Sequence, residues 1–503
     1  MTAEPTVIVP ARAPAPASTT PAKSGTPPHL TNWPLIHNMP DFLTPLLTDT
    51  FYLYYRNLNR TLGPIMTHFI FDRVENYVSD PTEMKRILTS KEFRRNDFFL
   101  KVTPDVFGYA LFAMETGPVW QKHRKAIVSG MGPQFVRKAY GVTVDLVQDL
   151  TRMFDAHIVN SEDGSFVMNI REYLSLLTLD VLTRVAFSHD MNCLQGFDDL
   201  KSGKDSVDKR SVQLRTYVDE IGRIGIYRTF VPKFLWGFFK ISETDVVPIT
   251  TYFDAMINEF LAPRRQKAEE GEEEESESDL LTPLLKKTED GEMLFSDKEI
   301  RDECMALMFA GHDTTSNTIT NVFLQLCQHP DALKTLHQEI DANYPPDSTE
   351  FPRLDELSKF EYLDYVFKET QRTKNILMGL DRVVASENME MLGYKFKKND
   401  YFSANLQTVF LDPQYWGPDA EEFKPERWIN KEVVDGTFMP FGAGQHMCPG
   451  MKMAIMEAKV VLIQLLRTFD FELIPGQKLE LVDGIVCHLP NGLELKVTKR
   501  REE

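Results

Sequence analysis

A single cysteine stands in a glycine-rich loop near the C-terminal end of this 503-residue chain. The loop runs from Phe438 to Gly450, and a long amphipathic stretch follows shortly after Cys448. The positive end of a helix dipole, with its unpaired N–H groups, favours a thiolate over a thiol. Apolar or small neighbours would keep water away: Phe441, Ala443 and Met447. Because glycine lets a backbone pass close to a bulky partner, this pattern predicts a thiolate ligand for a haem iron, which favours O–O bond cleavage.

A lone cysteine is more often a small buried apolar residue, and glycine-rich loops are often only turns. The full spacing Phe441-x-x-Gly444-x-x-x-Cys448-x-Gly450 is more specific, and it resembles the haem-binding loop of the cytochrome P450 family. The resemblance implies haem b with the Cys448 thiolate as axial ligand, and contacts from Phe441, Gly444, His446 and Gly450. His446 stands where the family more often has arginine, so we expect a weaker, pH-dependent contact there.

A long helix is predicted from Ser296 to Gln328. Ser296-Asp297-Lys298-Glu299 has the form of a capping box, and the apolar pattern stops at His329-Pro330. A helix of this length spans about 48 Å at ~1.5 Å per residue. We therefore expect it to cross a whole domain.

The middle of this helix reads Ala310-Gly311-His312-Asp313-Thr314-Thr315. Glycine and threonine are poor helix formers, and a threonine hydroxyl can bond a carbonyl one turn earlier and bend the helix. Alone, the string indicates an ordinary kink with one buried acid. It also resembles the oxygen-binding groove of the cytochrome P450 family. That resemblance implies that Ala310 leaves room at the cofactor, that Thr314 hydrogen-bonds the reacting oxygen, and that Asp313 supplies protons. His312 is interpreted as a space-filling residue.

Glu369 and Arg372 lie three residues apart on a helix predicted from about Phe360 to Thr373, close enough to pair. Glu-x-x-Arg is a common string, but here Pro425-Glu426-Arg427-Trp428 follows it. The combination resembles the structural triad of the family. It implies that Glu369, Arg372 and Arg427 hold the Cys448 region in place, where loss of one partner would leave a buried charge unpaired.

Trp120 and Arg124 are spaced one helical turn apart. An arginine fork matches a carboxylate well, and Trp120-x-x-x-Arg124 matches the family pattern for groups that hold the haem propionates. Arg382 stands where the family often has another propionate ligand. The resemblance therefore implies that Trp120, Arg124 and Arg382 bind the cofactor.

The same region is locally basic: Lys122, His123, Arg124, Lys125, Arg137 and Lys138. Random surface charge is the simpler interpretation, and a docking face for an acidic electron donor is the functional one. No dinucleotide-binding fingerprint follows Cys448. We therefore expect electrons from a separate protein, such as NADPH-cytochrome P450 reductase or another acidic electron donor.

The net charge of −18 argues against nucleic-acid binding. The five cysteines are odd in number and scattered, which fits neither a disulfide framework nor a zinc site and suits a reducing compartment. The sequence has no run of about 18 apolar residues and no signal-peptide pattern. We expect an intracellular protein, either cytosolic or peripheral on the cytoplasmic face of the endoplasmic reticulum.

We expect a mainly α fold with a small β region, with haem between the long central helix and the cysteine loop. Residues 1–32 have the composition of a disordered tail, and residues 33–503 are expected to form one catalytic domain with an acidic loop at 263–292. Residues 69–78 predict the main sheet region and residues 83–260 mostly helix. Residues 485–487 and 493–497 predict short strands.

The resemblance implies a haem-thiolate monooxygenase that uses O2 and two electrons to oxidise a lipophilic organic substrate. Two alternatives are a haem-thiolate isomerase or dehydratase acting on peroxides and a non-catalytic haem carrier or sensor. Neither needs Asp313 or Thr314, so monooxygenation is preferred. By family position the distal pocket is apolar, with these residues near it: Phe107, Tyr109, Phe112, Met305, Met308, Phe309, Ile376, Leu377, Leu380, Leu489 and Pro490.

Overall fold

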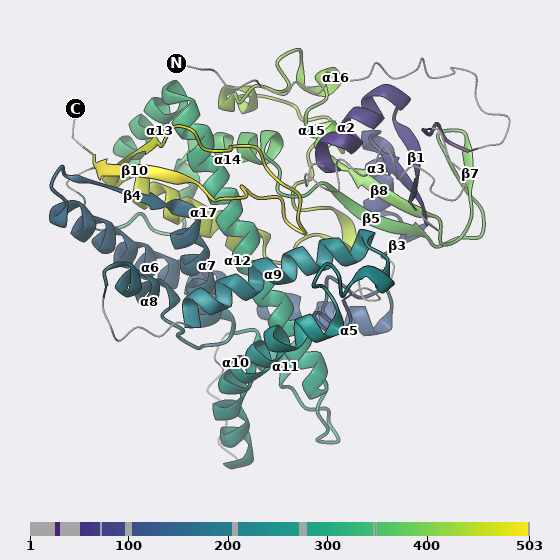
Figure 1. Cartoon of the computed structure of the whole chain (residues 1–503), viewed down its shortest axis with the longest axis horizontal. Coiled ribbons are helices and arrows are strands. Elements are labelled where there is room, and N and C mark those ends of the chain that lie inside the picture. The colour runs from purple at the N-terminus through teal and green to yellow at the C-terminus, as the bar shows by residue number, and fades with distance from the viewer. Residues whose placement is uncertain are drawn as a thin grey trace.

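The computed structural model describes residues 26–30, 51–70, 73–95, 103–203, 210–270, 279–345, 348 and 350–500. Helices make up most of these residues, and small sheets lie at two sides of the molecule (Figure 1). The prediction of a mainly α fold with a small β region is confirmed. The first 25 residues of the predicted tail lie outside the described residues. His29, near its other end, forms a parallel bridge with Thr67.

The main helices are α2 (Phe51–Leu62), α3 (Pro81–Thr89), α5 (Pro118–Gly130), α6 (Pro133–Asn160), α7 (Ile170–Ala186), α8 (Cys193–Lys201), α9 (Arg210–Phe230), α10 (Glu243–Glu270), α12 (Asp297–Gln328), α13 (Pro330–Asn343), α14 (Glu361–Thr373) and α17 (Met451–Thr468). Short helices are α11 (Leu281–Leu284), α15 (Leu406–Phe410), α16 (Pro413–Trp416) and the 3-10 turns η1 (Lys233–Leu235), η2 (Glu356–Lys359), η3 (Pro425–Trp428) and η4 (Gly444–His446). Proline begins α3, α5, α6 and α13, where its fixed φ is helical and its missing N–H costs nothing.

The helix α12 runs through the middle of the molecule (Figure 1) and packs against α7, α14 and α17. Ser296 and Glu299 form the predicted capping box, with the Ser296 N–H donating to Glu299 Oε2 at 2.8 Å. The helix ends at Gln328, just before Pro330, as predicted. Most of its residues are buried, so its polar side chains must find partners inside the fold.

The largest sheet has the strand order β1-β2-β8-β5-β3, in which β2 and β8 are parallel and the other neighbours antiparallel. A second sheet has the order β4-β10-β9, and β6 pairs with β7. The strands are β1 (Ile65–Ile70), β2 (Arg73–Val78), β3 (Phe93–Arg94), β4 (Ser165–Asn169), β5 (Gly379–Val384), β6 (Met389–Met391), β7 (Tyr394–Phe396), β8 (Tyr401–Asn405), β9 (Phe469–Leu473) and β10 (Glu494–Lys499). The sheet region predicted at residues 69–78 is therefore confirmed.

Two local predictions are wrong. Residues 485–487 are not a strand, because they lie inside a turn that the bridge between Val482 and His488 closes. The acidic segment predicted as a loop from residue 263 is helical as far as Glu270. Pro263 removes one hydrogen bond, but the Arg, Gln, Lys, Ala and Glu residues after it favour helix strongly enough to continue α10. Residues 271–278 lie outside the described part.

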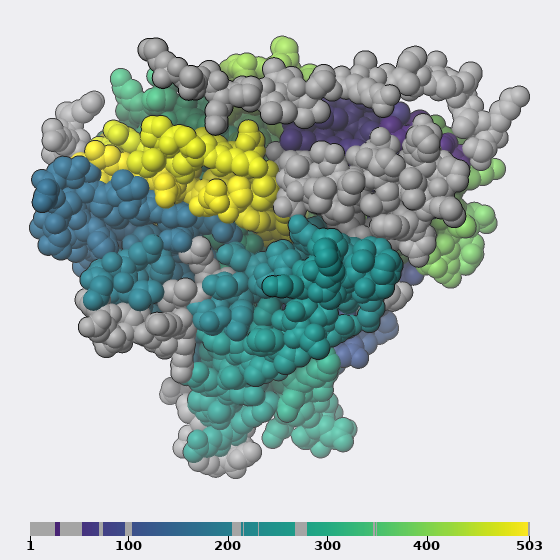
Figure 2. Space-filling view, in the orientation of Figure 1, coloured from purple at the N-terminus to yellow at the C-terminus, as the bar shows by residue number. Residues whose placement is uncertain are grey.

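Residues as distant in sequence as Val106 and Val497 belong to one buried apolar cluster. A second cluster lies under the largest sheet, and Met439 of the cysteine loop belongs to it. The helices α9 and α10 cover the front of the molecule over α12 (Figures 1 and 2). Within the described residues, none of the helices is both long and apolar enough to cross a membrane.

Candidate active site

Cys448 lies just before α17, and its N–H donates to the Phe441 carbonyl at 2.9 Å, which closes the loop. Burial raises the pKa of the Cys448 thiol, while the N–H groups of Gly450 and Met451 and the Arg124 guanidinium act in the opposite direction. The helix start therefore acts as predicted, and the lost hydration of the buried sulfur acts against it. A coordinated metal ion reverses this balance, since a metal-bound thiol loses its proton.

Gly444 allows the cysteine loop to lie directly against α3. Its φ is +67°, a left-handed conformation. A Cβ atom at this position would lie 2.6 Å from the Leu88 carbonyl oxygen and 3.0 Å from Thr89 Cα. These are backbone atoms that cannot move aside, so only glycine fits.

Ala310 is exposed in the middle of α12, although Met308 and Phe309 beside it are buried. The Thr314 hydroxyl donates to the Ala310 carbonyl at 2.8 Å, which is the backbone hydrogen bond predicted for this threonine. Together the two residues form a small, partly polar face on an otherwise buried helix. A flat group could approach α12 closely at this face.

Asp313 belongs to a polar network between α12, α7 and α9. Its Oδ1 accepts a hydrogen bond from Asn317 Nδ2 at 2.8 Å and lies 3.4 Å from Arg171 Nη2. Arg171 Nη2 is also 3.1 Å from Asp219 Oδ1, and the Asp219 side chain is 43% exposed. One guanidinium therefore connects the helix acid with a carboxylate at the surface.

His312 is buried, and its Nδ1 lies 2.7 Å from the Met308 carbonyl. Burial lowers its pKa, so the ring is neutral. No metal-ligand cluster is found among the described residues.

Cations and hydrogen-bond donors from separate segments meet beside the cysteine loop. Arg124 Nη2 donates to the Met447 carbonyl at 2.7 Å, and the Trp120 and His446 rings lie 4.2 Å apart between centroids. Thr116 Oγ1 bonds both His446 Nε2, at 2.9 Å, and the backbone N–H of Arg95, at 2.8 Å. Arg95 thus lies in the same group as the predicted Trp120, Arg124 and His446.

The positive charges of this group repel one another. Burial, and then Arg382 and Arg124, lower the pKa of Arg95 to about 9. Burial lowers the pKa of Arg382 to about 10. None of these three arginines forms an ion pair with a carboxylate among the described residues, and the buried Trp120 Nε1 has no acceptor there. Arg382 is buried and Arg95 and Arg124 are half-buried. Positive charge withdrawn from water without a counter-charge is costly, so the group fits an anion with two carboxylates, as haem has.

His446 lies next to three arginines. Burial, followed by the charges of Arg95, Arg382 and Arg124, lowers its pKa to about 2, which favours the neutral ring in the protein alone. The sequence could not place these arginines beside His446. The pH-dependent contact of His446 with the cofactor stays a prediction.

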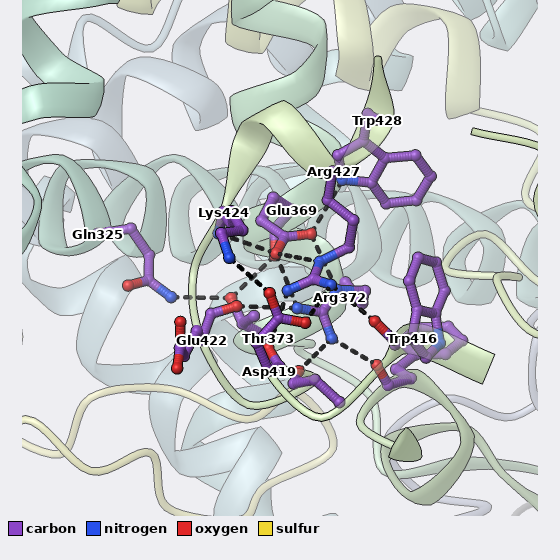
Figure 3. Close-up of polar contacts among 12 residues, drawn as sticks. Gln325, Glu369, Arg372, Thr373, Trp416, Asp419, Glu422, Lys424, Arg427 and Trp428 are labelled. Atoms are coloured by element: carbon purple, nitrogen blue, oxygen red, sulfur yellow. Dashed lines mark hydrogen bonds and ion pairs between the residues drawn. The ribbon is translucent and has the colours of Figure 1, made fainter. Parts of the chain in front are cut away.

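The Glu369 carboxylate is buried and accepts hydrogen bonds from three side chains (Figure 3). Arg372 donates from Nε at 2.8 Å and Nη2 at 2.7 Å, Arg427 Nε lies at 3.2 Å, and Trp428 Nε1 donates at 2.9 Å. Arg372 also donates to the Phe410 and Glu422 carbonyls. The sequence-predicted set of Glu369, Arg372 and Arg427 is thus brought together.

Aromatic rings connect this network with the start of the cysteine loop. The Phe438 ring lies 4.7 Å from Trp428, 6.2 Å from Trp416 and 5.3 Å from Phe410, between centroids. Trp428 donates to Glu369, and Arg372 lies over the Trp416 ring at 5.0 Å. The position of Phe438, and with it the loop that follows, therefore depends on the buried ion pairs.

The basic surface predicted around α5 is smaller than the sequence indicated. Lys122 pairs with Glu299, and His123 is fully buried beside Glu303. Arg124 turns toward the cysteine loop, and Lys138 donates to a serine hydroxyl. Charged residues can face inward whenever acids lie opposite them, which a local charge count cannot detect. The exposed members are Lys125 and Arg137.

Several of the predicted pocket residues pack against one another, whereas Tyr109 lies apart from them. The Phe107, Phe112 and Phe309 rings contact one another, with centroids 4.8, 5.4 and 6.3 Å apart. Met305 is buried in the same apolar cluster. Tyr109 is 45% exposed and lies under the Lys298 ammonium instead, so it faces solvent.

The family model described as Cytochrome P450 matches residues 27–497 of this chain. The chain belongs to the cytochrome P450 family. Over 487 residues it is 25% identical to the Arabidopsis thaliana protein "LUTEIN DEFICIENT 5, chloroplastic", covering 93% of this chain and 78% of that protein. It is 26% identical to alkane hydroxylase MAH1 of Arabidopsis thaliana, over 94% of both. It is 29% identical to cytochrome P450 3A40 of Oryzias latipes, over 69% of this chain and 68% of the relative.

Membership of the P450 family establishes the cofactor and the reaction class. The cofactor is haem b, with Cys448 as the axial thiolate ligand, and the enzyme is a monooxygenase. The donors beside the cysteine loop and the small face at Ala310 are compatible with this cofactor. A lipophilic substrate, O2 and a redox partner follow in general terms from the family.

Sequence reasoning missed Arg95. It sits in the string Phe93-Arg94-Arg95, which carries no spacing signal. Its backbone N–H bonds Thr116 and its Nη1 donates to the Leu111 carbonyl at 2.8 Å. Only the folded chain brings this arginine to Arg124 and Arg382.

Glu369→Ala would leave the buried Arg372 guanidinium without its carboxylate. We expect a loss of about 3–5 kcal/mol in the free energy of unfolding, seen as a lower Tm, together with reduced haem content because Phe438 loses its support. Glu361→Ala, an exposed acid on the same helix, is the control and should leave both quantities unchanged. Equal Tm and haem content in the two variants would contradict the role of Glu369.

Proposed function

We propose that this P450 monooxygenase oxidises a lipophilic organic substrate with two electrons delivered singly by a separate protein, an NADPH-cytochrome P450 reductase or another acidic electron donor. The observation that carries the proposal is the set of arginines beside the cysteine loop, Arg95, Arg124 and Arg382, which have no ion-pair partner within the described residues, together with the small face of α12. These features match two acidic groups and a flat ring.

In this proposal each donor of the cluster has a defined task. Arg95, Arg124, Arg382 and the Trp120 indole hold the haem carboxylates, which relieves the repulsion among the arginines. Phe441, Gly444, His446 and Gly450 let the loop lie close to the cofactor and keep water from the sulfur. When bound, haem supplies the activation of O2 that no side chain can provide.

Proton delivery is assigned to α12. Arg171 holds Asp313 beside the surface carboxylate Asp219. Because a guanidinium keeps its own protons, the Asp313 carboxylate itself is the group proposed to carry a proton inward. The Thr314 hydroxyl, now bonded to the Ala310 carbonyl, can rotate to donate to the reacting oxygen. Positioned acids of this kind commonly raise reaction rates by about 10²-fold or more.

The nature of the substrate is inferred from the aromatic and thioether side chains next to α12. Phe107, Phe112, Phe309 and Met305 provide a largely apolar lining, and methionine adapts to varied shapes. Such a lining favours burial of apolar surface over recognition of polar groups. A hydrocarbon-rich substrate agrees with it best.

The assignment of Cys448 is tested by the spectrum of the reduced, carbon-monoxide-bound protein. We expect the strongly red-shifted Soret band of thiolate ligation in the wild type and its complete loss in Cys448→Ala. Cys327→Ala removes a partly buried cysteine far from the loop and should keep the band. A band of the histidine type in the wild type would exclude Cys448 as the ligand.

Thr314→Ala should retain haem but lose control of proton delivery. We expect product per reducing equivalent to fall by at least about tenfold, with the missing equivalents recovered as hydrogen peroxide. Thr315→Ala is the matched control, because Thr315 is buried and its hydroxyl bonds the Gly311 carbonyl. Unchanged coupling in Thr314→Ala would remove this residue from the proton path.

Donor docking is tested by charge reversal at the exposed bases next to the cysteine loop. In Lys125→Glu/Arg137→Glu we expect reduction by an acidic reductase to slow by about tenfold at low salt, and the difference to shrink as ionic strength rises. Lys334→Glu on α13, which lies far from α5 (Figure 1), is the control for local charge reversal. The same rate in all three proteins would exclude docking at this face.

A further inference from the structure

His123 joins α5 to α12 through both of its ring nitrogens. Nδ1 lies 2.7 Å from Glu303 Oε1, and Nε2 lies 3.1 Å from Glu299 Oε1. The His123 side chain is 0% exposed and Glu303 is 1% exposed. A buried imidazole held between two carboxylates one helical turn apart is a bridge between helices, and the function assigned above does not use it.

The number of protons that the bridge needs follows from its two hydrogen-bonded contacts. Each nitrogen–carboxylate contact needs one proton between its two acceptor atoms. An imidazolium supplies both, and a neutral imidazole with a protonated Glu303 supplies the same two. Removing one proton turns a hydrogen bond into a repulsive contact between two lone pairs.

The surroundings place the mobile proton at Glu303. Burial raises the pKa of Glu303, with the His123 ring acting against it. Burial also acts to raise the pKa of Glu299, but Lys122, Ser296 and His123 together lower it to about 2, so Glu299 stays charged.

Other groups facing the bridge keep their own partners. Asp302 bonds Lys298 and Arg301, and Cys304, the next residue, is a buried thiol whose pKa lies well above its ordinary value because of burial. The Phe295 ring lies edge-on against His123, with centroids 4.9 Å apart. The proton between His123 and Glu303 is therefore one that these neighbouring groups do not supply.

The bridge connects the side chains of α5 that are proposed to bind the haem carboxylates with the face of α12 at Ala310 and Thr314. On α5, Trp120 lies one turn before His123 and Arg124 directly follows it. On α12, Glu303 lies two turns before Ala310, on the same side of the helix. A shift of α5 along α12 would move the propionate donors relative to the face at Ala310 and Thr314.

We propose that His123 is a positioning residue for haem: through Glu299 and Glu303 it fixes the carboxylate-binding side chains of α5 relative to α12, and it does so only while its shared proton is present. This rests on the proposed assignment of Trp120 and Arg124. The sign follows from the proton count. The bridge is complete at low pH and is lost as pH rises through the pKa of the shared proton.

The test measures the rate at which the purified holoenzyme releases haem to apomyoglobin, from about pH 5 to about pH 9, which includes the range where histidine ordinarily changes charge. We expect wild-type release to accelerate by about tenfold toward high pH, in keeping with loss of one charge-assisted hydrogen bond. In Glu303→Gln the amide N–H donates to Nδ1 at every pH, so release should stay within about twofold of its low-pH rate. His123→Ala should release haem about tenfold faster at all pH values.

Gln121→Ala, an exposed neighbour on α5, should behave as wild type. A wild-type pH step in Glu303→Gln, or slow release in His123→Ala, would overturn the proposal, and the near-isosteric Glu303→Gln decides the matter if His123→Ala fails to fold. Arg124→Ala distinguishes a failure of the proposed bridge from a failure of the proposed function. Fast release there with slow release in His123→Ala would leave the proposed function intact and refute the bridge. The reverse pattern would refute the role of Arg124 and retain the bridge.

Discussion

Glu369 is a carboxylate with almost no access to water, surrounded by two guanidinium groups, an indole N–H and a backbone N–H. A charge in such surroundings is tolerable only when all of its partners are in place. Arg372 lies on α14 with Glu369, whereas Lys424, Arg427 and Trp428 lie at η3, so satisfying this one group holds η3 against α14. The aromatic rings packed beside it then set where Phe438 stands. The cysteine loop starts from that point, which makes the geometry at Cys448 depend on electrostatics far from the sulfur.

Beside the cysteine loop, by contrast, positive charges have no paired carboxylate within the described part of the chain. There Arg382 and Arg124 lower the pKa of Arg95, and none of the three forms an ion pair with a carboxylate among the described residues. The unfavourable energy of a charge removed from water is compensated at Glu369 but not beside the cysteine loop. A cofactor with two acidic groups would compensate it there, so haem binding and local stability are coupled. The same reasoning explains the Cys448 thiol, which burial holds in its protonated form until a metal ion is coordinated.

The helix α12 connects these charged groups with the oxygen side of the site. Its first turn is occupied by Glu299, which caps the helix and contacts α5, its second by Glu303, and its middle by Ala310, Asp313 and Thr314. A helix buried along most of its length cannot leave polar side chains without partners. Asp313 therefore pairs with Arg171 and Asn317, and Glu303 with His123. The partners outside α12 come from α5 and α7, which ties the positions of these two helices to the residues proposed for catalysis.

Local pattern was enough to predict the long helix with its capping box, the sheet region at residues 69–78, the pairing of Glu369 with Arg372, and the family through the spacing around Cys448. These features depend on residues that are near one another in sequence. Local pattern failed at Arg95, at Lys122 and His123, which pair with acids of α12, and at the helical continuation past Pro263. The first three depend on which charges lie nearby in space, and long-range folding alone decides that. The sequence by itself determined the cysteine loop and the long central helix, because loop spacing and helix periodicity are local, and the family resemblance carried by that spacing gave the ligand and the reaction class. The tertiary structure decided which cations share one buried space and which acids neutralise them, because Coulomb interactions depend on distance in space and on burial.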